Sequence, residues 1–272
     1  MEYKPRLLRE TAEIALTEIK RFIEPRLRED FSLRRVSAPL YLPAGSRLLS
    51  GSAPGARVRL GGAGKEAEIV GSLDLWLRDQ LRCNDIAPGF GVFAIMNALR
   101  PDLPENRTSS PHVVAWAWQQ AVDAVDCNAR GVAVMAKEVY SLIVETEKMV
   151  LSLFPHLKAT LPEEFDEIEE ERLESHYPHA THERRMYEYM HPKDDDDDDG
   201  KETRRVLLVW RRHEERVASG ELWAWNRIVR RPVMLADLGA WGADDIAGCS
   251  SGGNIYRHYL GLQILQQDRL MV

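Results

Sequence analysis

Two β-rich runs joined by a polar loop constrain the fold of this chain more than any other feature. The first run is Gly91–Leu99, the second is residues 112–118, and the proline-containing loop 100–111 lies between them. Runs of this kind pair as antiparallel strands, so we expect a long hairpin. Because side chains alternate along a strand, Trp116 and Trp118 should lie on the same face of the hairpin.

The rest of the chain predicts helices on either side of an antiparallel sheet. Apolar spacing and capping residues indicate helices at residues 10–30, 72–83, 129–153 and 255–267, the last one after a glycine-rich turn. Extended runs indicate further strands at 33–42, around 58, at 66–70, 206–210, 222–225 and 232–235. Strands and helices do not alternate as in βαβ units, and the sequence contains no GxGxxG or GxxxxGK[ST] motif. We therefore expect an α/β protein of the α+β type, with helices flanking an antiparallel sheet.

Length and composition are those of a globular protein with an acidic middle. The chain has 272 residues, of which 44% are hydrophobic and 29% charged, and its net charge is −7. We expect a single domain over residues 1–272 with a variable acidic insert at about 163–203. The first part of the insert (EEFDEIEEERLE) should form a surface helix, and the six aspartates at 194–199 an exposed loop.

The sequence favours a cytoplasmic protein that neither enters a membrane nor binds nucleic acid. It has no run of about 18 apolar residues, and residues 1–14 lack the apolar stretch of a signal peptide. The three cysteines show no spacing typical of a zinc site. Acidic neighbours dilute the pairs of adjacent arginines, so we expect no nucleic-acid partner.

Several motifs share their order and spacing with a known enzyme family. Residues 70–78 (VGSLDLWLR) are similar to that family's SLxxWKR helix, residues 93–102 (FAIMNALRPD) to its MKALRPDE strand end, and residues 114–118 (VAWAW) to its DQWDWE strand. Residues 219–226 (SGELWAWN) are similar to its NGDILVWN segment. These motifs resemble asparagine synthetase A, and the resemblance implies the catalytic core of a class II aminoacyl-tRNA synthetase.

The resemblance also implies a reaction. Asparagine synthetase A uses ATP and Mg²⁺ to activate the β-carboxylate of aspartate as an adenylate, which ammonia then attacks. This chain would accordingly be an ATP-dependent, AMP-forming ligase that joins a small carboxylic acid to ammonia or an amine. The resemblance makes Arg100 and Arg257 the catalytic and ATP-binding residues, with Arg100 on the α-phosphate and Arg257 at the far end of the triphosphate. A planar guanidinium binds phosphate through two hydrogen bonds, although either arginine could instead pair with a surface carboxylate.

The positions that should recognise the amino acid differ from those of the family. By the resemblance, the substrate pocket contains Gly71, Leu77, Ala115 and Ala117, where the family has histidine, lysine, glutamine and aspartate. Such a pocket would leave a charged amino acid without partners. We therefore expect aspartate to be a poor substrate, and the preferred acid to be bulkier and less polar.

Two carboxylates are the candidate metal ligands. Asp237 lies close to the segment in which the family carries an acidic residue, and Glu221 lies in the segment similar to NGDILVWN. Carboxylate oxygens are the ligands that Mg²⁺ prefers in proteins.

Other interpretations stay open. The chain could be a binding or regulatory protein of the same fold that has lost the chemistry. His176, His179 and His182 could hold a metal on one helical face, but Pro178 interrupts that helix, and surface histidines are the simpler interpretation. The resemblance further implies a homodimer formed through residues 10–42.

Overall fold

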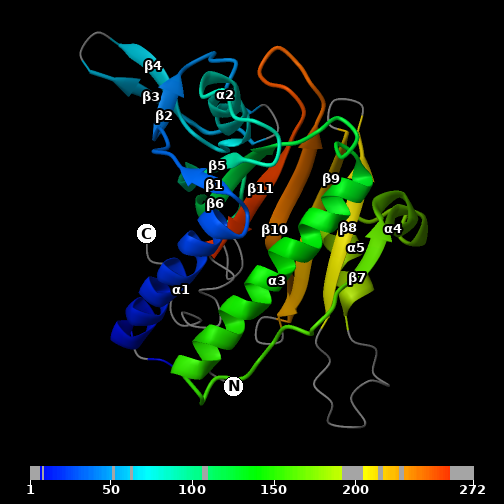
Figure 1. Cartoon of the computed structure of the whole chain (residues 1–272). Coiled ribbons are helices and arrows are strands. Elements are labelled where there is room, and N and C mark those ends of the chain that lie inside the picture. The colour runs from blue at the N-terminus through cyan, green and yellow to red at the C-terminus, as the bar shows by residue number, and fades with distance from the viewer. Residues whose placement is uncertain are drawn as a thin grey trace.

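An eight-stranded sheet forms the centre of the part of the chain that the computed structural model describes, residues 7, 9–50, 53–61, 64–105, 110–191, 205–213, 217–226 and 230–257. Its strands are β1 (Leu33–Arg35), β5 (Gly91–Leu99), β6 (His112–Ala121), β7 (Asp166–Glu169), β8 (Val206–Arg212), β9 (Ala218–Asn226), β10 (Arg231–Trp241) and β11 (Ser250–Tyr256). They lie in the order β1-β5-β6-β11-β10-β9-β8-β7 (Figure 1). Neighbours are antiparallel except at the two edges, where β1 is parallel to β5 and β7 to β8. The predicted fold class is therefore confirmed, with a parallel pair added at each edge.

The predicted hairpin is present. Strand β5 pairs with β6 along its whole length, from Gly91 opposite Gln120 to Leu99 opposite His112. Trp116 and Trp118 belong to the same buried cluster, so both rings lie on one face of the strand as predicted.

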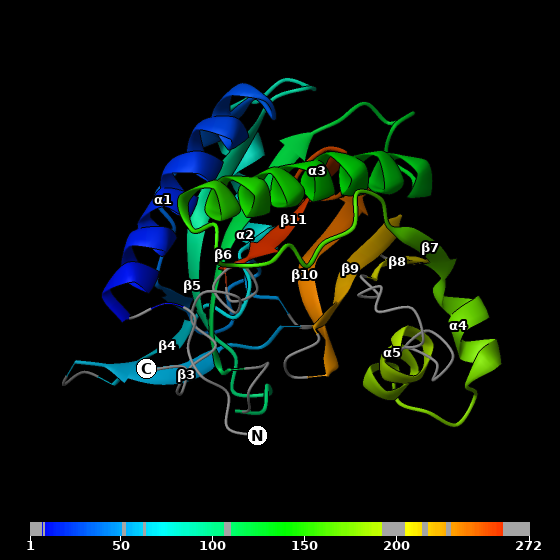
Figure 2. The same cartoon turned by 90° about the horizontal axis from the view of Figure 1, so that it is seen from below.

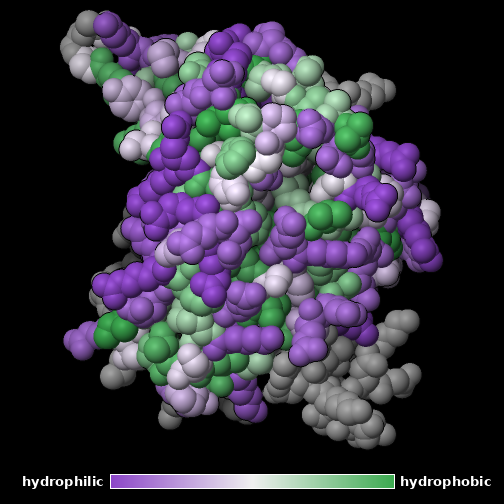
Figure 3. Space-filling model, viewed as in Figure 1, coloured by the Kyte–Doolittle hydropathy of each residue, from purple (hydrophilic) through white to green (hydrophobic). Residues whose placement is uncertain are grey.

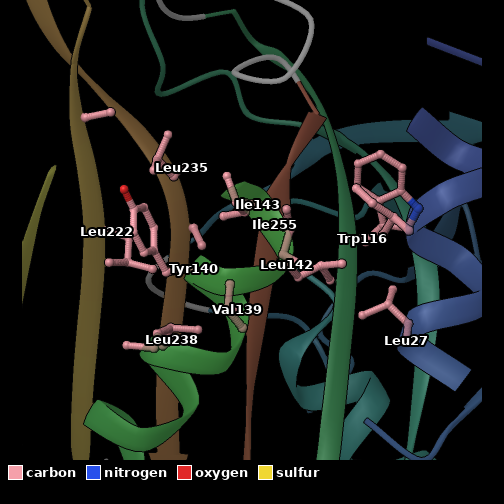
Figure 4. Close-up of a cluster of buried hydrophobic side chains, with 14 of the residues drawn as sticks. Leu27, Trp116, Val139, Tyr140, Leu142, Ile143, Leu222, Leu235, Leu238 and Ile255 are labelled. Atoms are coloured by element: carbon pink, nitrogen blue, oxygen red, sulfur yellow. The ribbon is translucent and has the colours of Figure 1, made fainter. Parts of the chain in front are cut away.

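Two long helices, α1 (Arg9–Glu29) and α3 (Ala129–Leu153), cover that face of the sheet (Figure 2). Helix α3 has the predicted bounds, because Asn128 caps it by accepting hydrogen bonds from the N–H groups of Arg130 and Gly131. The main core lies between these helices and the sheet and includes Val139, Tyr140, Leu142, Ile143, Leu222, Leu235, Leu238 and Ile255 (Figure 4). The outward side of the two helices is mostly hydrophilic (Figure 3).

The opposite face of the sheet carries smaller elements. Helix α2 (Asp74–Cys83) contacts β5, β6 and β11, and helices α4 (Glu170–His176) and α5 (His182–Met190) contact β7, β8 and β10. Next to α2 lies a three-stranded sheet in the order β2-β4-β3, made of β2 (Tyr41–Pro43), β4 (Lys65–Ile69) and β3 (Ala56–Leu60). The predicted strand at 33–42 is thus divided, since its first part joins the large sheet as β1 and its last part begins β2.

The acidic start of the insert is partly a strand. Sequence predicts a surface helix for EEFDEIEEERLE, but Asp166–Glu169 forms β7 before α4 begins. Ile168 supplies the reason, because its side chain is buried in a cluster with Leu207 and Val209 of β8. Burial of one apolar side chain and pairing with β8 outweigh the preference of the charged residues for a helix.

The glycine-rich segment near the end of the chain is also a strand. The sequence predicts a turn and then a helix from residue 255, whereas Ser250–Tyr256 forms β11 between β6 and β10. A Cβ atom on Gly253 would come within 1.9 Å of the carbonyl oxygen of Asp237, so the glycine allows a close approach of two strands.

Some of the predicted elements concern residues that the structure does not describe. Asp194 to Asp199 and residues 258–267 lie outside the described residues, so neither the acidic loop nor the rest of the closing helix is tested. Within the described ranges, no helix combines the length and the apolar character needed to cross a membrane.

Candidate active site

The candidate active site lies on the sheet face opposite α3, where β11, β10 and β9 are neighbours. One cross-strand row runs along this face: Ala117 lies opposite Asn254, Asn254 opposite Asp237, and Asp237 opposite Glu221. Residues directly opposite each other on antiparallel strands point to the same side, with Cβ atoms about 4.5–5.5 Å apart. The row therefore brings three polar side chains from distant parts of the sequence together.

Asp237 is the centre of this row. Its Oδ1 accepts a hydrogen bond of 2.8 Å from Asn254 Nδ2, and its Oδ2 accepts one of 2.7 Å from the hydroxyl of Tyr256. Burial, and then the charge of Asp237, hold the pKa of Tyr256 well above its usual value, so the phenol remains a donor. The two donors fix the orientation of a charged carboxylate on the sheet surface.

Arg100 belongs to the same electrostatic site. It follows the end of β5, and its Nε and Nη2 donate to Asp102 Oδ1 and Oδ2 at 2.9 and 2.7 Å. The hydrogen bonds to Asp102 raise the pKa of Arg100, and its charge also interacts with Tyr256 and Asp237. The guanidinium is therefore permanently charged, and a ligand phosphate would compete with Asp102 for its fork.

Arg257 lies at the same end of the sheet. It directly follows Tyr256 of β11 and is exposed. Strand β6 lies between β5 and β11. Arg100 follows β5 and Arg257 follows β11, and both strands end beside the first residues of β6. Their convergence on one triphosphate remains a prediction.

Glu221, the last residue of the row, is bonded to the insert. Its Oε2 accepts hydrogen bonds of 2.9 Å from His182 Nε2 and from Trp223 Nε1. The Nδ1 of His182 lies 3.2 Å from Glu170 Oε1, and Arg211 also donates to Glu170. This network, which we call the His182 network, ties α4 and α5 to the sheet next to the candidate site.

The His182 network perturbs both of its central groups. The hydrogen bonds to Glu170 and then Glu221 raise the pKa of His182 to about 9. Burial alone would raise the pKa of Glu170, but the hydrogen bonds from His182 and Arg211 lower it to about 2. At neutral pH, an imidazolium therefore bridges two carboxylates.

These shifts predict a pH-dependent stability. The raised pKa of His182 means that its contribution is complete below about pH 6.5 and is lost as the pH rises through about 9. The lowered pKa of Glu170 means that its contribution is present above about pH 4.5 and is lost as the pH falls toward 2. Urea unfolding of the unmodified protein should lose about 1–2 kcal/mol between pH 6.5 and 9.5, since partial exposure of His182 screens the interaction.

The matched variant for this prediction is His182→Gln, which cannot titrate. Its free energy of unfolding should lack the fall between pH 6.5 and 9.5. Parallel pH profiles for the two proteins would contradict the role given to His182.

The residues predicted to line the substrate pocket are buried. Leu77, Ala115 and Ala117 are each at most 1% exposed, and they pack in one apolar cluster between α2 and the sheet. Gly71 is not part of that cluster, and a Cβ atom on it would come within 2.2 Å of the carbonyl oxygen of Ala53. The structure thus gathers three of the four residues into an apolar layer at one end of the cross-strand row, and their role in substrate binding remains a prediction.

The predicted metal ligands, Asp237 and Glu221, are direct neighbours across β10 and β9. A pair of carboxylates suits Mg²⁺, which binds through one or two carboxylates together with nucleotide phosphates. Among the residues that the structure describes, no three His, Cys, Asp or Glu side chains are grouped so that they could hold a metal by themselves. The donor set therefore suits Mg²⁺ that arrives with ATP, and this role remains a prediction.

Three members of the site are not predicted from the sequence. Asn254 and Tyr256 alternate around the apolar Ile255, which is a weak strand signal, but the serines and glycines before them indicate a turn. His182 is predicted to be a surface histidine because its partners lie 12 and 39 residues away along the chain. No local pattern carries that information.

Comparison with solved structures reveals the same fold in asparaginyl-tRNA synthetases. The enzyme of Entamoeba histolytica in complex with asparaginyl-adenylate aligns with a TM-score of 0.65 and 8% identity, over 96% of this chain and 65% of that chain. The enzyme of Pyrococcus horikoshii, also with asparaginyl-adenylate, aligns with a TM-score of 0.64 and 12% identity. At such identities the likeness establishes the class II synthetase fold alone.

Sequence comparison is more specific. A family model described as aspartate–ammonia ligase matches residues 10–194. An aspartate–ammonia ligase of Bacteroides fragilis is 27% identical over 265 residues, which cover 87% of this chain and 74% of that protein. One of Clostridium perfringens is 34% identical over 189 residues, which cover 68% of this chain and 56% of that protein. The matched part thus spans about half to three quarters of these relatives, and by these matches the chain belongs to the aspartate–ammonia ligase family.

Proposed function

We propose that this protein is an ATP-dependent, AMP-forming ligase that activates a carboxylic acid as an adenylate and transfers it to ammonia or an amine. The observation that carries the proposal is Arg100, which lies within the matched family segment and whose charge interacts with the groups of Asp237 and Tyr256. A fixed positive charge next to a polar sheet surface can stabilise the charge that develops on phosphate and carboxylate oxygens. The family match favours this function over a binding protein without catalysis.

Each residue of the site would have a separate role in the reaction. Arg100 would neutralise charge where the acid meets the α-phosphate, and Arg257 would bind the far end of the triphosphate. Asp237 and Glu221 would hold Mg²⁺, which when bound neutralises phosphate oxygens. The site would position the reactants and exclude water, which accounts for much of the rate in such reactions.

We propose a cytoplasmic homodimer of one domain per chain, which acts on small molecules. Support comes from the family match, from the absence of a membrane-crossing helix among the described residues, and from the net charge of −7, which disfavours nucleic acid. The dimer would form through α1 and β1, whose outer side includes the exposed Ile14.

A pyrophosphate assay tests the reaction. Purified protein with ATP and Mg²⁺ should release pyrophosphate when a suitable carboxylic acid is added, and we expect L-aspartate to be a poor acid. The apolar layer of Leu77, Ala115 and Ala117 offers no partner to its charged groups, and each unpaired group costs about 1–3 kcal/mol. A panel of acids of graded polarity, each with and without ammonia, gives the measurement.

The panel can contradict the proposal in two ways. Pyrophosphate release that does not depend on any added acid would contradict the ligase function itself. Rapid formation of asparagine would leave the ligase function intact, but would contradict the expected preference for a less polar acid.

A further inference from the structure

Two carboxamide side chains on the site face bury polar atoms that have no partner in the described part of the protein. Gln119 is 0% exposed and Asn254 is 3% exposed. Both Nε2 and Oε1 of Gln119, and Oδ1 of Asn254, lack a hydrogen-bond partner among the described residues. A buried polar group left unsatisfied costs about 1–3 kcal/mol, so three such atoms gathered in one place require an explanation, which is either a ligand group or a buried water.

The two carboxamides are close neighbours. Gln119 lies opposite Gly252 on β11, and Asn254 is the next residue of β11 on that face, so they are diagonal partners. A Cβ atom on Gly252 would lie 2.7 Å from Gln119 Cδ and 2.8 Å from Nε2. The Gln119 carboxamide therefore extends across Gly252 onto β11, which is the strand that carries Asn254.

Asn254 connects this pair to the candidate active site. Its Nδ2 donates to Asp237 Oδ1, which fixes the carboxamide and leaves Oδ1 as the acceptor that is not used. Since Gln119 and Asn254 are almost completely buried, only a small polar group could be held between them.

The atoms without partners define the chemistry of that end. Gln119 Nε2 requires an acceptor, whereas Gln119 Oε1 and Asn254 Oδ1 each require a donor. A primary carboxamide supplies one acceptor and two donors. A carboxylate would place an oxygen against the two acceptors, and an ammonium group would leave Nε2 unsatisfied.

We propose that Gln119 and Asn254 form a subsite for a primary carboxamide. The ligand oxygen accepts from Gln119 Nε2, one ligand N–H donates to Gln119 Oε1, and the other donates to Asn254 Oδ1. The subsite deepens the proposed function, on which its biological meaning rests. In an amide-forming ligase, the bound carboxamide belongs either to the amide product or to the far end of the acid substrate.

Calorimetry without ATP tests the subsite directly. Within each matched pair the amide should bind at least tenfold more tightly than the acid, propionamide than propionate and L-asparagine than L-aspartate, because two of the three hydrogen bonds become repulsive contacts with the acid. The α-amino and α-carboxylate groups weaken L-asparagine and L-aspartate alike, so they cancel in this comparison. Equal affinity for the amides and the acids, or no binding of either amide up to high millimolar concentration, would overturn the proposal and would indicate that a buried water satisfies the carboxamides.

The decisive variant is Gln119→Met, which keeps the length of the side chain and removes its polar atoms. We expect a melting temperature that is unchanged or higher, since the unsatisfied atoms are gone, together with at least a tenfold loss of L-asparagine affinity. A structural role for Gln119 would instead lower the melting temperature. The control is Gln80→Met, at a half-buried position on α2, which should change neither quantity. Unchanged asparagine affinity in Gln119→Met would overturn the proposal.

Turnover distinguishes the two sources of the amide and separates this inference from the proposed function. If L-asparagine itself supports pyrophosphate release with ATP, the amide belongs to the acid substrate. If it binds and inhibits release that depends on another acid, the amide is the product. Amide-selective binding that Gln119→Met abolishes, in a protein that never releases pyrophosphate, would support the subsite and contradict the ligase function.

Discussion

Replacing Arg78 by methionine is expected to lower the free energy of unfolding by about 3–5 kcal/mol, because the change removes a buried guanidinium together with its hydrogen bonds to Ser250, Asp244 and Gly242. Arg78 is 1% exposed. Its guanidinium donates to Ser250 Oγ at 3.0 Å, to Asp244 Oδ2 at 2.6 Å and to the carbonyl oxygen of Gly242 at 3.0 Å. Helix α2 is thereby fastened to the ends of β10 and β11.

Urea denaturation followed by tryptophan fluorescence measures this loss. The control is Arg59→Met, since Arg59 is exposed and forms an ion pair with Glu66 alone among the described residues, and it should change the free energy of unfolding by less than about 0.5 kcal/mol. A loss below about 1 kcal/mol in Arg78→Met would show that hydration of Asp244, which is partly exposed, compensates for the missing charge.

The second large effect concerns ligand binding. Arg100→Ala is expected to weaken ATP binding ten- to a hundredfold, because a charge-assisted contact to phosphate contributes about 1.5–3 kcal/mol. Acid-dependent release of pyrophosphate should fall at least as much, since the same charge stabilises the transition state. The fold should persist, because the only ion-pair partner of Arg100 among the described residues is Asp102, which is 38% exposed and can be hydrated.

Calorimetry with ATP and the pyrophosphate assay measure the two quantities, and circular dichroism confirms folding. Arg59→Ala serves as the control, because it removes an exposed arginine on β3, outside the proposed site and the proposed dimer interface. ATP affinity and turnover that match the unmodified protein would contradict the assignment of Arg100.

The elements that the sequence predicts well are those whose signals are local. Helix α3 carries its own cap, Asn128, and a continuous apolar stripe, so its bounds follow from residues 128–153 alone. The hairpin of β5 and β6 likewise follows from two adjacent β-rich runs. In these cases propensity, periodicity and tertiary packing agree.

The elements that the sequence misjudges depend on partners far away in the chain. Strand β7 exists because β8 pairs with it, and the acidic residues around Ile168 give no sign of that pairing. Strand β11 lies between β6 and β10. Glycines usually indicate a turn, but here Gly252 and Gly253 allow the backbones of the neighbouring strands to approach closely.

The same distinction explains what could be predicted of the site. Arg100 can be identified because the ALRPD motif around it is contiguous in sequence. The partners of Asp237 cannot be identified in this way, since Asn254 and Tyr256 reach it only when β11 lies beside β10. Gln119 is still less visible, because its burial without partners is a property of the folded sheet.

The pairing of β6 with β11 has a consequence for how the chain folds as it is synthesised. Ser250 lies opposite Ala121, so the ribosome adds more than a hundred residues after β6 before its partner emerges. During that interval the growing sheet exposes β6 as an open edge, with unpaired backbone groups and buried-type side chains such as Val113. Contacts of such long sequence separation form slowly. Release of a chain that ends before β11 should therefore yield aggregates rather than a smaller folded protein, and folding of the full chain should depend on chaperones that bind exposed strand edges.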